Sequence, residues 1–132
     1  MGTVKAEFPM CQEPYLSKVE MISYLETVGI KIPKLYKLGF SHNNCSGMCV
    51  RGGQGHFIHL LKTFPDRYEW LENYEKEMQA YLGKEVTILK RTRNKVQENL
   101  SLEQLRKEYQ ANQTEQIDMF DIGGCGCFVN YD

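Results

Sequence analysis

Residues 41–64, SHNNCSGMCVRGGQGHFIHLLKTF, join a loop rich in glycine, asparagine and serine to a helical segment. The loop half carries Cys45 and Cys49, and small neighbours of this kind let the backbone approach a bound group closely. In residues 54–63 the apolar side chains fall on one side of a helix that stops before Pro65. The stretch therefore predicts a cysteine-bearing loop that leads into a helix with one apolar side.

Towards the N-terminus, residues 14–28 place apolar side chains at steps of three, which is helical spacing. Ser17 and Glu20 are positioned to form a capping box at the start of this helix, and Gly29 ends it. The connector that follows has one helical turn at most, over residues 33–37.

Towards the C-terminus, residues 65–82 predict a long amphipathic helix. Its apolar face carries Trp70, Tyr74, Met78, Tyr81 and Leu82, and its acidic face carries Asp66, Glu69, Glu72, Glu75 and Glu77. Residues 85–89 (EVTIL) are the best strand candidate, and residues 90–99 predict a basic, exposed turn. Ser101 and Gln104 predict a capping box for a helix that runs to about residue 109.

These segments predict a mainly α-helical chain with little β structure, folded as one small domain with long loops over residues 1–132. A chain of this length can bury a hydrophobic core without disulfides. The net charge of −1 and the pI near 6.3 favour neither nucleic acid nor a membrane as partner. Because no export signal is recognisable, we expect a cytoplasmic protein.

The C-terminal segment IDMFDIGGCGCFVNYD, residues 117–132, is unexpectedly apolar for the end of a chain. Its apolar side chains include Ile117, Met119, Phe120, Ile122 and Phe128. We therefore expect an ordered tail that folds back onto the body of the protein, because exposed apolar side chains favour burial.

Four of the five cysteines form two closely spaced pairs, Cys45/Cys49 and Cys125/Cys127. In a reducing compartment, clustered cysteines are more often metal ligands or redox groups than disulfides. An iron–sulfur cluster, [4Fe–4S], is the first choice, and zinc is the alternative, for which the cramped C-x-C pair is less usual. A metal-free thiol redox protein ranks last, because a disulfide within C-x-C would be strained.

Cys11 adds a fifth thiol, one more than a four-ligand site needs. Either Cys11 is a ligand and one cysteine of the C-x-C pair is left over, or Cys11 is not part of the site. The favoured ligand set is Cys11, Cys45, Cys49 and Cys125, although the ligand within the C-x-C pair stays open. Cys127 is then the spare thiol, and a free thiolate beside a cluster is a candidate catalytic nucleophile.

Two further groups lie near the first cysteine pair. His42 is three positions before Cys45 and is either a metal ligand, an acid–base group or a loop histidine bonded to backbone. Arg51, Gly52 and Gly53 form a cationic loop that either holds an anion such as phosphate or sulfate, or simply connects two elements.

Three strings, LYKLGFSHNNCSGMCVRGGQGHF (35–57), FPMCQEPYLSK (8–18) and DIGGCGCF (121–128), together resemble the C-terminal half of phosphoadenosine phosphosulfate reductase-like proteins. These proteins belong to the adenine nucleotide alpha-hydrolase superfamily and are common in phages and bacteria. The resemblance covers about residues 7–128. It implies that the cysteines belong to one site, that a [4Fe–4S] cluster lies near a nucleotide, and that Arg51 and its glycines lie near an anionic sulfonucleotide.

The nucleotide-binding half of that family carries an SGGxDS-type phosphate loop on a Rossmann-like sheet, and this sequence has no such motif. The resemblance therefore implies either a separate C-terminal domain or a small protein that retains only the metal module. We expect a nucleotide-binding PP-loop domain or protein as partner, and no reductase or sulfurtransferase activity of the chain alone. The alternative is a structural zinc module without catalytic activity, which presents Trp70, Tyr74 and Tyr81 to a partner.

Overall fold

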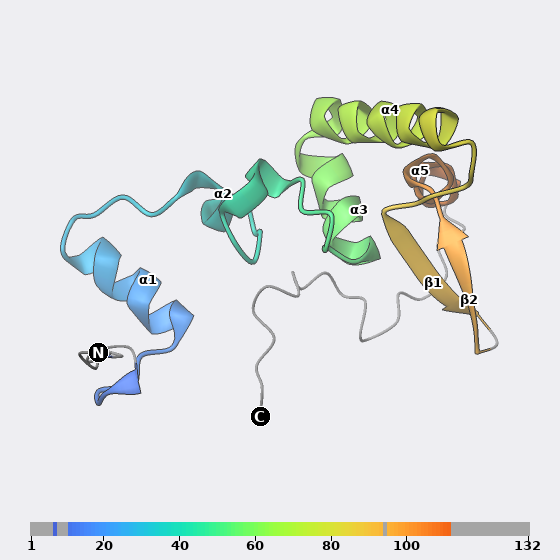
Figure 1. The fold of residues 1–132 in the computed structure, drawn as a ribbon. Helices are drawn as coiled ribbons and strands as arrows, with labels where there is room; N and C mark the ends of the chain where they lie inside the picture. The colour runs from blue at the N-terminus through green and yellow to red at the C-terminus, as the bar shows by residue number, and fades with distance from the viewer. Residues whose placement is uncertain (1–6, 8–10, 94, 112–132) are drawn as a thin grey trace, which may run out of the picture. The chain divides into compact units, whose positions relative to one another are not determined.

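The computed structural model describes residues 7, 11–93 and 95–111, and these are mainly α-helical, as the sequence predicts (Figure 1). The described elements are α1 (Lys18–Thr27), α2 (Lys34–Lys37), the 3-10 helix η2 (Asn44–Gly47), α3 (Gln54–Thr63), α4 (Pro65–Leu82), β1 (Leu89–Arg93), β2 (Val96–Leu100) and α5 (Leu102–Gln110). The chain divides into two compact units, Met1–Pro33 and Lys34–Asp132.

The first unit contains α1, which starts with the predicted capping box. The Ser17 backbone N–H donates to Glu20 Oε2 (2.7 Å), and the Glu20 backbone N–H donates to Ser17 Oγ (3.3 Å). The helix therefore begins at Lys18 rather than at residue 14. Gly29, at φ 76°, follows the helix in the left-handed conformation that costs glycine little.

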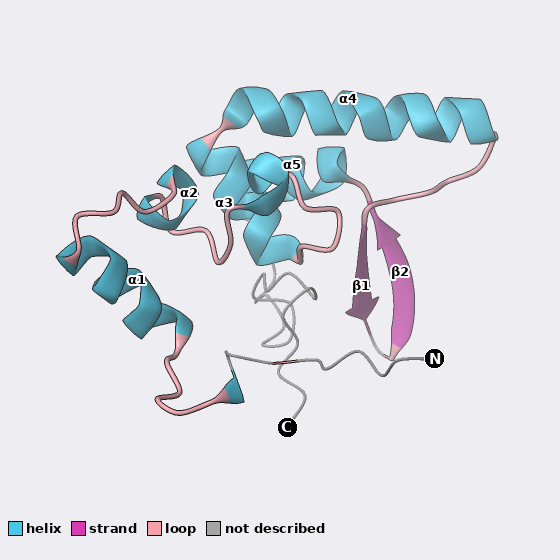
Figure 2. Ribbon diagram, turned by 60° about the vertical axis from the view of Figure 1, so that its left-hand side comes forward, coloured by secondary structure: helices cyan, strands magenta, loops and turns pink. Residues whose placement is uncertain are grey.

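Within the described residues of the second unit, α2, α3, α4, α5 and the β1–β2 hairpin pack around one core. Helix α4 lies across α3 and α5 (Figures 1 and 2). Arg91 of β1 joins the hairpin to α5 through an ion pair with Glu108 (3.0 Å). The buried apolar cluster comprises Leu35, Phe40, Phe57, Ile58, Leu60, Tyr68, Leu71, Leu89, Leu100, Leu102 and Leu105.

Helix α4 does not bury the face that its amphipathic pattern indicates. Its buried residues are Tyr68, Leu71, Glu72 and Glu75, so two side chains of the predicted acidic face lie inside. Trp70, on the predicted apolar face, is 56% exposed. The reason is that the two buried carboxylates both have partners, which offsets the cost of removing their charge from water.

Glu75 joins α4 to the segment before β1 and to the start of α5. Its Oε1 accepts from the backbone N–H of Ile88 (2.8 Å), and its Oε2 accepts from the backbone N–H of Leu102 (2.8 Å), the first residue of α5. A carboxylate at a helix N-terminus is also stabilised by the helix dipole. The Tyr68 hydroxyl donates to the Leu102 carbonyl (2.7 Å), so both backbone groups of Leu102 are held by α4.

Glu72, the other buried carboxylate of α4, forms an ion pair with Arg106 of α5. The Arg106 guanidinium of α5 donates twice to it, from Nε to Oε2 (2.8 Å) and from Nη2 to Oε1 (3.0 Å). Lys76 adds a third contact to Oε1 (3.0 Å). The hydrogen bonds from Arg106 are the main reason that the pKa of Glu72 lies below its ordinary value. In the same region, burial raises the pKa of Tyr68 well above its ordinary value, and the Glu72 charge adds to this.

The hairpin corrects the strand prediction. The predicted strand 85–89 is wrong, because β1 begins only at Leu89, and the segment 90–99 predicted as a turn forms most of both strands. The backbone of residues 86–88 is instead bonded to α4. Gln79 Nε2 donates to the Val86 carbonyl (2.9 Å), in addition to the bond between Ile88 and Glu75.

The capping box predicted for α5 is half formed. The Ser101 side chain accepts from the Gln104 backbone N–H (3.2 Å), so Ser101 is the N-cap. The Gln104 side chain donates to Glu108 (2.9 Å), one turn further along the helix, rather than returning to the cap.

Removing the Glu75 carboxylate should destabilise the second unit strongly. We expect Glu75→Ala to lower the free energy of unfolding by about 2–4 kcal/mol, because the buried N–H of Leu102 and the partly buried N–H of Ile88 lose their acceptor. Urea unfolding measures this, with Glu77→Ala, exposed on the same helix, as the control that should change little. A loss of less than about 0.5 kcal/mol would contradict the role of Glu75.

Protonation of Glu72 should weaken the fold in acid. Because its pKa is lowered from 4.5, the pair with Arg106 contributes fully above that pH, and the contribution disappears as the pH falls through the lowered pKa. At neutral pH we expect Glu72→Gln to lose about 1–3 kcal/mol, and this difference from the wild type should shrink in acid. Urea unfolding as a function of pH tests this, with exposed Glu69→Gln as control; a pH-independent difference would refute it.

Candidate metal centre

The loop around the first cysteine pair has an unusual backbone. Cys45 (φ 57°, ψ 15°) and Ser46 (φ 52°, ψ 29°) both adopt the left-handed conformation, and Gly47 (φ 82°) follows them. Two contacts hold this turn: the Met48 N–H donates to the Cys45 carbonyl (2.8 Å), and Arg67 Nη1 of α4 donates to the Ser46 carbonyl (2.6 Å). The turn is thus held by one hydrogen bond within itself and by one from α4.

The predicted ligands lie in different parts of the chain. Cys45 is exposed, whereas Cys49 is buried and its carbonyl accepts from the Gly52 N–H (2.8 Å). Cys11 is exposed and belongs to the first unit. Cys125 and Cys127 lie outside the described residues.

No group of three or more His, Cys, Asp or Glu that could hold a metal ion occurs within residues 7, 11–93 and 95–111. Two thiols on one short loop supply at most half of a four-ligand site. A cysteine-ligated centre that uses Cys45 and Cys49 therefore requires further donors, from Cys11, from His42 or from outside the described residues. The donor chemistry fits either iron–sulfur or zinc, since both take thiolates.

All three histidines of the chain gather near Phe40. The ring of His42 stacks on the ring of His56, with centroids 5.8 Å apart and planes at 9°. His42 is only 3% exposed, and in the described part of the chain neither of its ring nitrogens has a hydrogen-bond partner. A buried polar group without a partner is uncommon in native proteins and calls for an explanation.

His56 and His59 each bond to a backbone carbonyl. His56 Nε2 lies 2.8 Å from the Gly47 carbonyl, and His59 Nε2 lies 2.7 Å from the Leu38 carbonyl. Burial is the main reason that the pKa of His56 is lowered, and His42 and His59 also disfavour its charged form. A neutral His56 ring that donates a hydrogen bond to the Gly47 carbonyl connects α3 to the end of η2.

The predicted anion loop has a structural role at one position. Arg51 is exposed, and Gly53 is the N-cap of α3, without a side-chain cap. Gly52 is buried against His56, where an added Cβ would lie 2.6 Å from the ring Cδ2 and 2.8 Å from Cγ. Close packing against His56 thus explains why residue 52 is a glycine. Arg51 and Gly53 remain available to a ligand.

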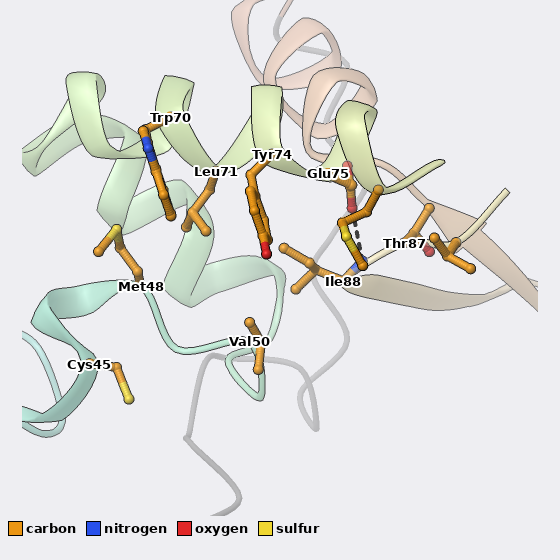
Figure 3. A pocket seen from close by; sticks show the side chains of 11 residues that line it. Cys45, Met48, Val50, Trp70, Leu71, Tyr74, Glu75, Thr87 and Ile88 are labelled. Atoms are coloured by element: carbon orange, nitrogen blue, oxygen red, sulfur yellow. Dashed lines mark hydrogen bonds between the residues drawn. The ribbon is translucent and has the colours of Figure 1, made fainter. Parts of the chain in front are cut away.

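A groove beside Cys45 was missed at the sequence level. It has a volume of about 410 Å³ and is lined by Cys45, Met48, Val50, Trp70, Leu71, Tyr74, Glu75, Met78, Val86, Thr87 and Ile88. Figure 3 shows Trp70, Leu71 and Tyr74 projecting from α4 toward the groove. The rings of Trp70 and Tyr74 stack at 5.4 Å, nearly parallel. Their spacing of four was visible in the sequence, but the opposite wall was not, because it comes from residues 48–50 and 86–88.

In comparisons with known proteins, no family model, no curated protein and no solved structure matches the chain. The resemblance to reductase-like proteins therefore remains a prediction. Among the described helices, none combines the length and the apolar character needed to cross a membrane.

Adding a methyl group at Gly52 should disturb the histidine cluster. We expect Gly52→Ala to lower the free energy of unfolding by about 1–3 kcal/mol, because the new Cβ overlaps the His56 ring. A double-mutant cycle by urea unfolding tests the cause, since the cost should shrink in a His56→Ala background. An unchanged cost in that background would assign the effect to backbone conformation instead.

Proposed function

We propose that this chain is a cysteine-ligated metal-binding module, with [4Fe–4S] as the preferred group, that serves a sulfonucleotide reductase-like or sulfur-transfer protein in the cytoplasm. The observation that carries the proposal is the left-handed turn at Cys45 and Ser46. Non-glycine residues in this conformation cost about 1–3 kcal/mol each and cluster at functional sites. A turn held in this way beside a second cysteine supports a ligand role for Cys45.

The proposed ligands are Cys11, Cys45, Cys49 and one cysteine of the C-terminal pair, Cys125. Cys45 is exposed and therefore accessible to a cluster, and Cys49 lies one short turn away in the chain. A cluster bound by thiolates would place a fixed charge near an anionic substrate. Arg51, exposed after the same loop, suits a phosphate or sulfate group.

In the proposed role, the remaining thiolate, Cys127, attacks the sulfur of an activated sulfonucleotide. The bond from its sulfur to the sulfonate sulfur forms while the bond from that sulfur to the nucleotide phosphate oxygen breaks. The electron pair of the broken bond leaves with the nucleotide. A PP-loop domain or protein would supply nucleotide binding, so the chain alone is not proposed to turn over substrate.

A structural zinc module is the second candidate, and His42 is the observation that favours it. Zinc takes mixed cysteine and histidine ligands, whereas iron–sulfur clusters are held mainly by cysteine. His42 lies three positions before Cys45, is buried, and has two ring nitrogens without a described partner. In this reading the module has no catalytic thiol and acts as a binding domain.

Metal analysis and an absorption spectrum of anaerobically purified full-length protein test the proposal. We expect iron and sulfide with a broad band near ~400 nm, because thiolate-bound clusters absorb there. Cys45→Ser and Cys49→Ser should each lose the metal. Ser46→Ala, next to Cys45 and exposed, is the matched control and should keep it.

The outcomes separate the two candidates. A colourless protein with one zinc per chain, lost in His42→Ala, would replace the iron–sulfur proposal with the zinc module. Comparison of Cys11→Ser, Cys125→Ser and Cys127→Ser identifies the other ligands, since only a ligand variant loses metal. A chain without any bound metal would refute both candidates.

A further inference from the structure

Large apolar side chains that line the groove beside Cys45 are exposed to solvent instead of being packed in the core. Val50 is 61% exposed, Trp70 56% and Tyr74 49%, and all three line it. Contiguous exposed apolar surface on a protein marks a site of interaction. The groove lies wholly within the second unit, between α4, the loop after η2 and the segment before β1.

The chemistry of the lining restricts the occupant. Glu75 is its single charged residue, and both carboxylate oxygens are already used by the backbone N–H groups of Ile88 and Leu102 (Figure 3 shows the first of these bonds). A polar small molecule would therefore find no charged anchor in the groove. An apolar segment of polypeptide fits the lining better, because burial of apolar area drives its binding.

We propose that the groove binds residues 117–128 of the same chain. This segment contains Ile117, Met119, Phe120, Ile122 and Phe128 within twelve positions, a density of large apolar side chains suited to the groove. The docking itself needs no metal. Docking would also bring Cys125 and Cys127 close to Cys45. That these cysteines then ligate one metal rests on the proposed function.

The length of the connection allows this docking. Helix α5 begins at Leu102, which is bonded to the groove residue Glu75, and its nine residues rise about 13.5 Å away from that point. The chain from Ala111 to Ile117 spans at most about 20 Å when extended. Ile117 can therefore return to the groove without strain.

Charge favours the same occupant. Residues 112–132 carry four acidic side chains and no basic one, whereas the rest of the chain has sixteen basic and thirteen acidic side chains. In the two loop segments that line the groove, residues 48–51 and 84–90, the exposed charged side chains are the cations Arg51, Lys84 and Lys90 and the acid Glu85, a net charge of +2. The acidic Asp118 and Asp121 would thus approach a positive rim.

Photo-cross-linking on the full-length protein tests the docking. We expect Tyr74→p-benzoylphenylalanine, which places the probe in the groove, to cross-link to residues 117–128 of the same chain. The same probe at Tyr81, which is 84% exposed on the same helix and outside the groove, is the matched control and should not. Adding Phe120→Ser and Ile122→Ser should lower the Tyr74 cross-link about tenfold, because apolar burial is lost.

Other cross-links would overturn the docking. A covalent dimer would assign the groove to a second copy, a link to residues 1–33 would assign it to the first unit, and absence of any link would leave the segment undocked. Metal content is measured on the same samples, with and without a chelator. Metal without the cross-link refutes the docking alone, and the cross-link without metal refutes the proposed function alone.

Discussion

The second unit depends on one buried carboxylate. Glu75 accepts two backbone N–H groups, from the segment before β1 and from the first residue of α5, so a single side chain sets where the hairpin and the last described helix meet α4. A buried N–H group without an acceptor, such as that of Leu102, would cost about 1–3 kcal/mol, and the partly buried N–H of Ile88 would add to this. Tyr68 completes the arrangement from the same helix by donating to Leu102. The contacts that organise this core are therefore polar ones inside an apolar shell.

This use of α4 determines where the candidate site lies. Because the helix turns Glu72 and Glu75 inward, its Trp70 and Tyr74 face the groove that Met48, Val50 and Ile88 complete. Arg67, also on α4, holds the Ser46 carbonyl and so connects the helix to the cysteine turn. The cysteine loop and the groove thus share one rigid support. A change in the position of α4 would therefore shift both the cysteine loop and the groove, since packed elements transmit strain.

Local signals in the sequence predicted the local elements well. Ser17 with Glu20, the glycine after α1, and Pro65 at the first turn of α4 act through neighbouring backbone, so they can be read without the fold. The errors lie where partners are distant in sequence. Residues 85–89 look like a strand because three of them, residues 86–88, are β-branched, but the backbone of Val86 and Ile88 bonds to Gln79 and Glu75 of α4. Cys45 was predicted as a site residue, while its left-handed backbone and the groove beside it depend on Arg67 and α4 and could not be foreseen.

Trp70 is the single tryptophan of the chain, and it lies in the groove, stacked on Tyr74. Indole emission shifts with the polarity around the ring, and no second indole contributes background. The intrinsic fluorescence of the protein therefore reports on one defined place, the groove. The emission wavelength of Trp70 reports whether the groove is exposed to solvent or covered, in purified protein or in a mixture with partners that lack tryptophan.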